Sequence, residues 1–360
     1  MEPSQGDQAM EDQKVDSGIV FDWIMVVLGF WFTVGLYLDI WAHIHKSVIE
    51  TFFTPWHAVL YSGFLASAVF LYIAMIRNQI KGHDWRHAVP KGYDLSLLGV
   101  VIFLVGGVGD MFWHTSFGIE KGIEAVYSPT HLLLGLGGGL IGSGPIRASW
   151  YRSDKNRLIK WVHWFPTVLS FTGVVSLFTA LSVSFHPLTN LWASQNSFRS
   201  MSGRLSEEMG VISIVLTAVI LIVPILLLVR RWKPLPGTFT LLFSVNAIGM
   251  GFTYPEDYPV LSVIALGVSG FVFDLMVHVL NPSISRVGQL RILAFLTPGV
   301  WTVLYFVSIQ VTDGLSWSVH LWGGVVFISS IAGWLLSYLL IPPKIPSPQR
   351  VLIEDSGIPD

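Results

Sequence analysis

Residues 18–41 read GIVFDWIMVVLGFWFTVGLYLDIW, an apolar stretch with Asp39 near its end. A spanning helix needs roughly 20 mostly apolar residues, so this stretch predicts a transmembrane helix. The whole chain is similar in character, with 52% hydrophobic and 12% charged residues among 360. We therefore predict an all-α, polytopic membrane protein with about ten spanning helices. The segments expected are 18–41, 56–76, 93–113, 127–146, 161–184, 209–229, 236–254, 259–280, 291–311 and 317–341.

The chain divides into a long membrane domain and two short tails. Residues 1–16 are polar and acidic, and residues 342–360 begin with several prolines, so both are expected to be flexible cytoplasmic tails. The membrane domain, 17–341, contains two hairpins, 17–76 and 93–146, that both start on the same side. Hairpins with this relation form a parallel repeat about an axis along the membrane normal, and a shared site can lie between them.

Basic residues predict the orientation in the cell membrane. The loops on the side of the termini are rich in Lys and Arg, whereas the opposite loops contain only Lys46, Lys121, Arg199 and Arg204. The positive-inside rule then places both termini in the cytoplasm.

Each hairpin carries the same polar residues at the same offsets. Both sets have an aspartate, a histidine four residues later, and a glutamate seven residues before a second histidine. The sets are Asp39, His43, Glu50 and His57, then Asp110, His114, Glu124 and His131. The second histidines lie in Thr54-Pro55 and Ser128-Pro129 segments that are typical of a helix N-cap followed by proline. The aspartates and histidines are expected at the outer ends of the helices, and the glutamates in the loops between them.

These residue types predict a metal site. Ionisable groups at membrane depth are costly and mark functional sites, and one ion compensates several of them. The chain has no cysteine, so the ligands must be nitrogen and oxygen atoms. Imidazole and carboxylate suit copper, iron and zinc, with copper or iron favoured here. The alternative without a metal is that each aspartate accepts a hydrogen bond from its own histidine four residues on.

The spacing resembles the copper-binding pattern of the C subunit of particulate methane and ammonia monooxygenases. There, one helix supplies Asp and His and the next supplies a second His. The resemblance implies Asp110, His114 and His131 as ligands, or Asp39, His43 and His57 in the other copy. It covers two helices, and the gaps to His57 and His131 are wider than in that family. As a whole, the chain resembles polytopic bacterial membrane proteins.

The function expected is a metal-dependent oxidoreductase, monooxygenase-like, acting on a small or lipophilic substrate. Asp39, His43, His57, Asp110, His114 and His131 would be metal ligands, and Glu50 and Glu124 bridging ligands or proton-transfer groups. A zinc-dependent membrane hydrolase is one alternative. A metal-ion or proton transporter, with Asp274 and His278 as its exit, is another.

The partners expected are membrane lipid and the substrate. A net charge of −2 gives no sign of nucleic-acid binding. The sequence leaves open a homo-oligomer or other membrane subunits.

Overall fold

The computed structural model describes residues 14–46, 51–85, 87–118, 120, 123–152, 160–196 and 203–342. In these residues the chain is all helix and turn, without a strand. The helices long and apolar enough to cross a membrane are α2 (Gly18–His45), α3 (Pro55–Ile80), α4 (Asp94–Phe117), α8 (Trp161–Ala180), α11 (Gly203–Arg231), α13 (Val260–Leu280), α14 (Val287–Thr312) and α15 (Val319–Leu340). The predicted all-α polytopic membrane protein is thus confirmed.

Five shorter helices complete the described part. They are α5 (Glu124–Tyr127), α6 (Pro129–Gly142), α7 (Gly144–Tyr151), α9 (Pro187–Asn190) and α12 (Thr238–Phe252). Two predicted spanning segments, 127–146 and 236–254, correspond to α6 and α12, which have only 14 and 15 residues. α6 starts at Pro129, after its cap Ser128, and ends at Gly142, where Ser143 separates it from α7; α12 starts after Gly237, which has a φ of 89°. The predicted count of about ten was therefore approximate, and eight described helices reach spanning length.

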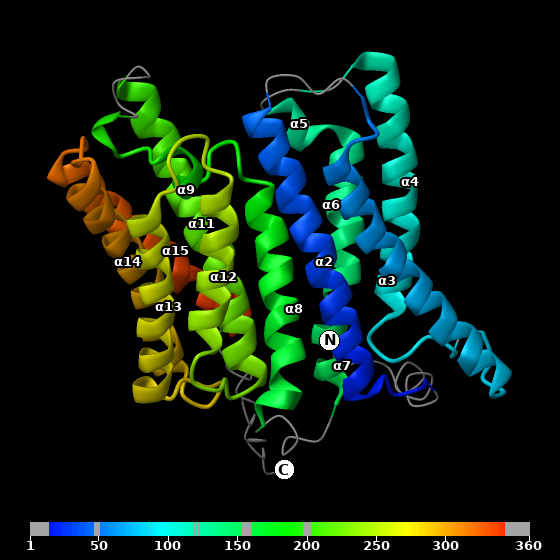
Figure 1. The fold of residues 1–360 in the computed structure, drawn as a ribbon. Coiled ribbons are helices and arrows are strands. Elements are labelled where there is room, and N and C mark those ends of the chain that lie inside the picture. Colours follow the sequence, from blue (N-terminus) through cyan, green and yellow to red (C-terminus); the bar gives the residue numbers. More distant parts are fainter. Residues whose placement is uncertain are drawn as a thin grey trace, which may run out of the picture.

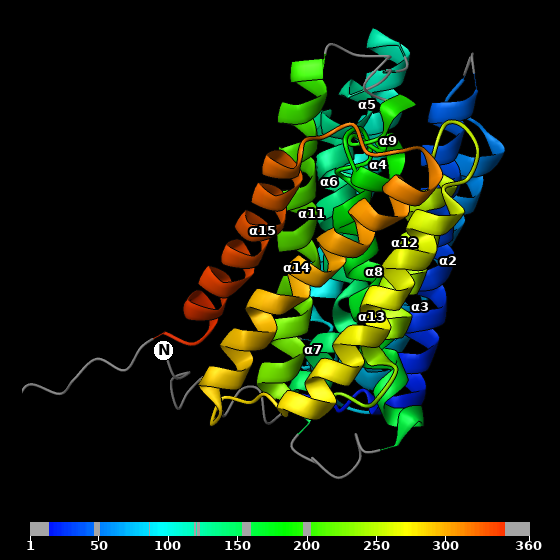
Figure 2. The ribbon, with the colours of Figure 1, turned by 90° about the vertical axis from the view of Figure 1, so that its left-hand side faces the viewer.

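The bundle has two parts joined by α8. In Figure 1, α2 to α7 lie on one side and α11 to α15 on the other, with α8 between them. α8 packs against both α2 and α12. Figure 2 shows that the start of α2 and the end of α15 lie at the same end of the bundle, away from α5 and α9. The four helices α2, α3, α4 and α6 therefore present their Asp- and His-bearing ends next to α5 and α9.

Glycines allow the two hairpins to pack at very short range. A Cβ atom on Gly35 of α2 would lie 2.5 Å from Leu60 Cα of α3, and one on Gly137 of α6 would lie 2.7 Å from Phe103 N of α4. The neighbours are backbone atoms, so no side chain can give way. Glycine at these positions brings the Asp- and His-bearing helices of each hairpin together.

A buried ion pair holds the other end of α2. Arg152, which follows α7, pairs with Asp22, and the Tyr93 hydroxyl donates a hydrogen bond of 2.8 Å to the same carboxylate. Asp22 is only 1% exposed, so its charge needs such partners. This contact fixes α2 relative to α4 and α7, and hence the orientation in which Asp39 meets the second hairpin.

Candidate metal centre

Both returning helices begin as the sequence predicts. Thr54 is the N-cap of α3, and its hydroxyl accepts a hydrogen bond of 3.2 Å from His57 N. Ser128 is the N-cap of α6, and its hydroxyl accepts one of 3.4 Å from His131 N. Proline follows each cap as the first helical residue. The second histidine of each set is thereby held in a rigid first turn, facing the outgoing helix.

The first Asp/His group consists of Asp39, His43 and His57. His57 Nε2 lies 3.0 Å from Asp39 Oδ1, and His43 Nε2 lies 3.9 Å from the same atom. Asp39 and His57 are buried and His43 is partly buried. One ligand atom from each of the three lies within 4.8 Å of the others.

The second Asp/His group consists of Asp110, His114 and His131. His131 Nε2 lies 3.2 Å and His114 Nε2 lies 3.4 Å from Asp110 Oδ1. Asp110 also accepts hydrogen bonds from the Thr130 hydroxyl, at 3.0 Å, and from the Tyr61 hydroxyl, at 3.4 Å. Here too the three ligand atoms lie within 4.8 Å of one another, and the aspartate is only 1% exposed.

The distances within each group fit ligands of one ion. Two ligand atoms about 2.1 Å from an ion, at a tetrahedral angle, lie about 3.4 Å apart. The observed nitrogen-to-oxygen distances of 3.0, 3.2 and 3.4 Å agree with this, and His43, at 3.9 Å, needs only a small movement. Each of the two groups can therefore hold a metal ion.

Unpaired buried atoms argue against the alternative without a metal. Asp39 Oδ1 and His114 Nε2 are buried, and neither makes a well-directed hydrogen bond to the described residues. In the first group the histidine four residues after the aspartate is also not its nearest partner, since His43 Nε2 lies 3.9 Å from Asp39 Oδ1 and His57 Nε2 lies 3.0 Å from it. Buried polar atoms without partners are costly, and a shared cation would satisfy them.

Contacts at Nδ1 leave Nε2 available for a ligand bond. His57 Nδ1 donates a hydrogen bond to the Phe52 carbonyl, which can only accept, so Nε2 of the neutral ring carries the lone pair. His131 Nδ1 lies 2.9 Å from Ser128 Oγ, and His114 Nδ1 lies 2.9 Å from Glu120 Oε2. Outer partners of this kind orient ligating histidines in metal proteins. All three rings direct Nε2 toward the aspartate of their own group.

The two groups are neighbours. The ring centroids of His57 and His114 are 6.4 Å apart. Tyr61 of α3 bridges the hairpins, since its hydroxyl donates to Asp110 while its ring lies 6.1 Å from that of His57. Sequence reasoning missed Tyr61, although it lies one helical turn after His57 and therefore on the same face of α3. It also missed Thr130, which is next to His131.

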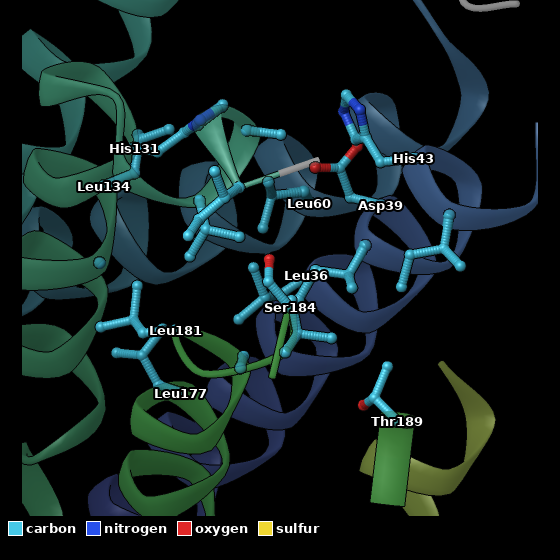
Figure 3. Close-up of a pocket in the computed structure, with 18 of the residues that line it drawn as sticks. Leu36, Asp39, His43, Leu60, His131, Leu134, Leu177, Leu181, Ser184 and Thr189 are labelled. Carbon is cyan, nitrogen blue, oxygen red and sulfur yellow. The ribbon is translucent and has the colours of Figure 1, made fainter. Parts of the chain in front are cut away.

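A cavity of about 580 Å³ opens beside both groups. Asp39, His43, His57, Asp110 and His131 all line it. In Figure 3, Asp39 and His43 of α2 and His131 of α6 stand at one end of the cavity, and leucines surround its middle. Five of the six predicted ligands thus line one chamber, and the sixth, His114, is not among its lining residues.

The loop glutamates differ from one another in position. Glu50 lies outside the described residues. Glu124, the first residue of α5, is exposed and lines a surface hollow. Glu120 is partly buried and contacts His114. The roles of Glu50 and Glu124 in bridging or proton transfer stay predictions.

We expect Glu120→Gln to weaken metal binding at the second group about 10- to 100-fold. The amide lacks the negative charge that holds the His114 ring with Nε2 toward Asp110. Titration of metal-stripped protein, followed by calorimetry, measures the change.

Glu124→Gln is the matched control, because it makes the same substitution four residues along the chain. We expect wild-type affinity, since Glu124 is exposed. If Glu124→Gln weakens binding and Glu120→Gln does not, Glu124 is a ligand, in agreement with its predicted role as a bridging ligand.

Asp274 has hydrogen-bond partners other than His278 in the structure. Asp274 accepts hydrogen bonds from the backbone N of Phe239 and Thr240, at 3.1 and 2.9 Å, and from the Thr240 hydroxyl. It therefore caps the start of α12 from the neighbouring helix α13. His278 is exposed. This capping role accounts for Asp274 without an ion or proton relay.

Two further histidines near the cavity have structural roles. His45 places its ring nitrogens 2.9 Å from the Trp41 carbonyl and 3.0 Å from the Tyr254 carbonyl, and so ties α2 to the loop after α12. His186 is fully buried and accepts a hydrogen bond of 3.1 Å from Leu188 N at the start of α9. Burial lowers the pKa of His186 to about 3, so it stays neutral at physiological pH.

Comparison of the chain with protein-family models, with curated proteins and with solved structures found no significant match to any of them.

Proposed function

We propose that this membrane protein holds two metal ions, one at each Asp/His group, and is a metal-dependent oxidoreductase. The observation that carries the proposal is the pair of groups, each with one carboxylate and two imidazole ligand atoms within 4.8 Å of one another. The groups lie side by side at one chamber, so both can serve one reaction.

The chain's own residues hold and orient the centre. Asp39 and Asp110 supply the negative charge, and four imidazoles supply nitrogen ligands. Phe52, Ser128 and Glu120 fix the ring orientations from outside. The Tyr61 hydroxyl can hold or move a proton at Asp110 Oδ2. A copper or iron ion there would supply dioxygen activation, whereas zinc would supply a more acidic bound water.

Copper or iron is the proposed metal. Imidazole and carboxylate ligands suit both, and the chain has no cysteine to favour a thiolate site. The resemblance of each Asp/His group to the copper pattern of the monooxygenase C subunit supports the same choice. Zinc suits the same ligands and would make the protein a membrane hydrolase.

The proposed location is the cell membrane, with both termini in the cytoplasm and the metal centre on the outer side. The distribution of Lys and Arg along the sequence supports this orientation. The Asp/His groups lie at the helix ends opposite the start of α2 (Figure 1). Cysteine accessibility labelling of the α12–α13 loop in whole cells checks the orientation.

Metal analysis of protein purified without chelators and without a polyhistidine tag tests the proposal. We expect about two equivalents of copper or iron, with an optical or EPR signal. His114→Ala and His131→Ala should each lose metal, because each removes a ligand nitrogen.

His83→Ala is the control, since His83 is exposed on the loop after α3, and it should keep the full metal content. Equal metal in all three variants would refute the ligand assignment. Stoichiometric zinc without copper or iron would replace the oxidoreductase by the hydrolase, and metal-dependent ion flux in liposomes would replace it by a transporter.

A further inference from the structure

We propose that the chamber beside the metal centre binds an elongated lipophilic molecule whose single polar group lies at the two Asp/His groups. This inference rests on the proposed function and specifies the class of its substrate. It depends on the walls of the chamber, on where its polar atoms are unpaired, and on its size.

The walls of the chamber are apolar along most of its length. They come from helices of both parts of the bundle, and leucine and phenylalanine side chains contribute to them together with isoleucine, valine and alanine. Those from the hairpins and α8 are Phe32, Leu36, Leu60, Phe103, Leu134 and Leu177. Figure 3 shows Leu36, Leu60, Leu134, Leu177 and Leu181 around the space between the Asp/His groups and Thr189. Such a lining favours hydrocarbon over a solvated polar molecule.

One end of the chamber, called the near end, lies at the Asp/His groups, and the far end lies at Thr189 and Asn190. The two ends differ in whether their polar atoms have hydrogen-bond partners. At the far end, Asn190 Nδ2 donates to the Ser184 and His186 carbonyls, and the hydroxyls of Thr189 and Thr253 lie 3.5 Å apart. At the near end, Asp39 Oδ1 makes no well-directed hydrogen bond to the described residues. A ligand's polar group is therefore expected at the near end, where it completes the centre, and its chain is expected to extend toward α8 and α9.

The size and the opening of the chamber fit a molecule of this kind. A volume of about 580 Å³ lies within the range of roughly 300 to 1,000 Å³ of small-molecule sites. Two lining residues, Ile123 next to α5 and Pro255 in the α12–α13 loop, are exposed and mark its mouth. A chain of about twelve carbons with one terminal hydroxyl is a suitable probe.

The experiment uses dodecan-1-ol with a diazirine near its methyl end, bound to the metal-containing protein in detergent and activated by light. We expect labelling of residues 177–190, which line the far part of the chamber. Excess dodecan-1-ol should reduce this labelling at least 10-fold, whereas dodecane should not. Equal competition by the alkane, or labelling of the lipid-facing helix surfaces alone, would overturn the inference.

A pair of glycine variants provides the matched control. A Cβ atom on Gly135 would make only an ordinary contact, 3.6 Å from Leu181 Cδ2, and Gly135 lines the chamber, so the side chain of Gly135→Val narrows it beside Leu181. Gly142 lies two turns further along α6, outside the chamber, with an equally mild contact of 3.8 Å to Val174 Cγ2. Labelling should fall at least 10-fold in Gly135→Val and stay unchanged in Gly142→Val.

Metal analysis of the same samples separates the two proposals. Both glycine variants should keep the wild-type metal content, because neither residue belongs to an Asp/His group. Metal without chamber labelling would overturn the lipophilic substrate and leave the metal centre intact. Chamber labelling in a protein that binds no metal would overturn the proposed function and leave the lipophilic site.

Discussion

Replacing Asp110 with asparagine is expected to reduce the bound metal from two ions to one per chain. Asp110 Oδ1 lies 3.2 and 3.4 Å from the ligand nitrogens of His131 and His114, so it is the anionic member of the second group. Asparagine has the same shape but no charge, and its amide directs either a neutral oxygen or an N–H group at the site. We expect the metal affinity of this group to fall more than about 100-fold. Loss of a residue that only hydrogen-bonds to a ligand already lowers metal affinity by up to about 100-fold, and Asp110 is proposed as a ligand itself.

The fold should survive Asp110→Asn. The hydroxyls of Thr130 and Tyr61 both donate to the carboxylate, and the amide oxygen can still accept from one of them. The variant also removes a charge that is costly at membrane depth. Circular dichroism and the melting temperature in detergent check that the protein is folded, and elemental analysis gives the metal stoichiometry.

Asp39→Asn is the reciprocal variant and Asp84→Asn is the control. Asp39→Asn should empty the first group and leave the second, again giving one ion, because the two groups share no ligand. Asp84 is exposed in the loop after α3, so its variant should bind two ions. Two ions retained by a folded Asp110→Asn would show that Asp110 is not a ligand.

Gly35→Ala is expected to destabilise the first hairpin and empty its Asp/His group. The added Cβ would lie 2.5 Å from Leu60 Cα and 2.6 Å from Leu60 N. Because these are backbone atoms, α2 and α3 must move apart, and overpacking of this kind costs about 1 to 3 kcal/mol. Gly35 precedes Asp39 by one turn and Leu60 follows His57 by nearly one, so the shift separates the two ligand atoms that lie 3.0 Å apart.

Gly29→Ala is the control on the same helix. A Cβ atom there has no neighbour within 4 Å, and alanine raises helix propensity, so we expect an unchanged or slightly higher melting temperature. Thermal unfolding in detergent and metal stoichiometry are measured on both variants. If Gly35→Ala has the same melting temperature as Gly29→Ala and binds two ions, the close approach of α2 and α3 is not required for metal binding by the first group.

The candidate ligands could be predicted because their placement is local. Asp and His four residues apart share one face of a helix, and Ser or Thr before proline fixes the first turn of the next. The sequence therefore predicted that Asp39 and His43 lie together, and that His57 and His131 begin the returning helices. Because both hairpins start on the same side of the membrane, the sequence also predicted that a shared site could lie between them.

Loop conformation could not be predicted in the same way. The spacing of seven residues singled out Glu124, but in the structure Glu120 contacts His114 and Glu124 is exposed. Likewise, Asp274 and His278 have the same spacing as the Asp/His groups. The start of α12, which packs against α13, accounts for Asp274 instead.

The sequence by itself determined that the chain is a bundle of membrane helices and that Asp39 and His43, like Asp110 and His114, share one face of a helix end, because hydrophobicity and helical period act over a few turns. Only the tertiary structure decided that Tyr61 joins the two groups and that α8, α9 and α11 close an apolar chamber around them. These contacts link residues more than 40 positions apart. They depend on how closely the helices pack at their glycines, and the sequence pattern along a single helix does not specify that distance.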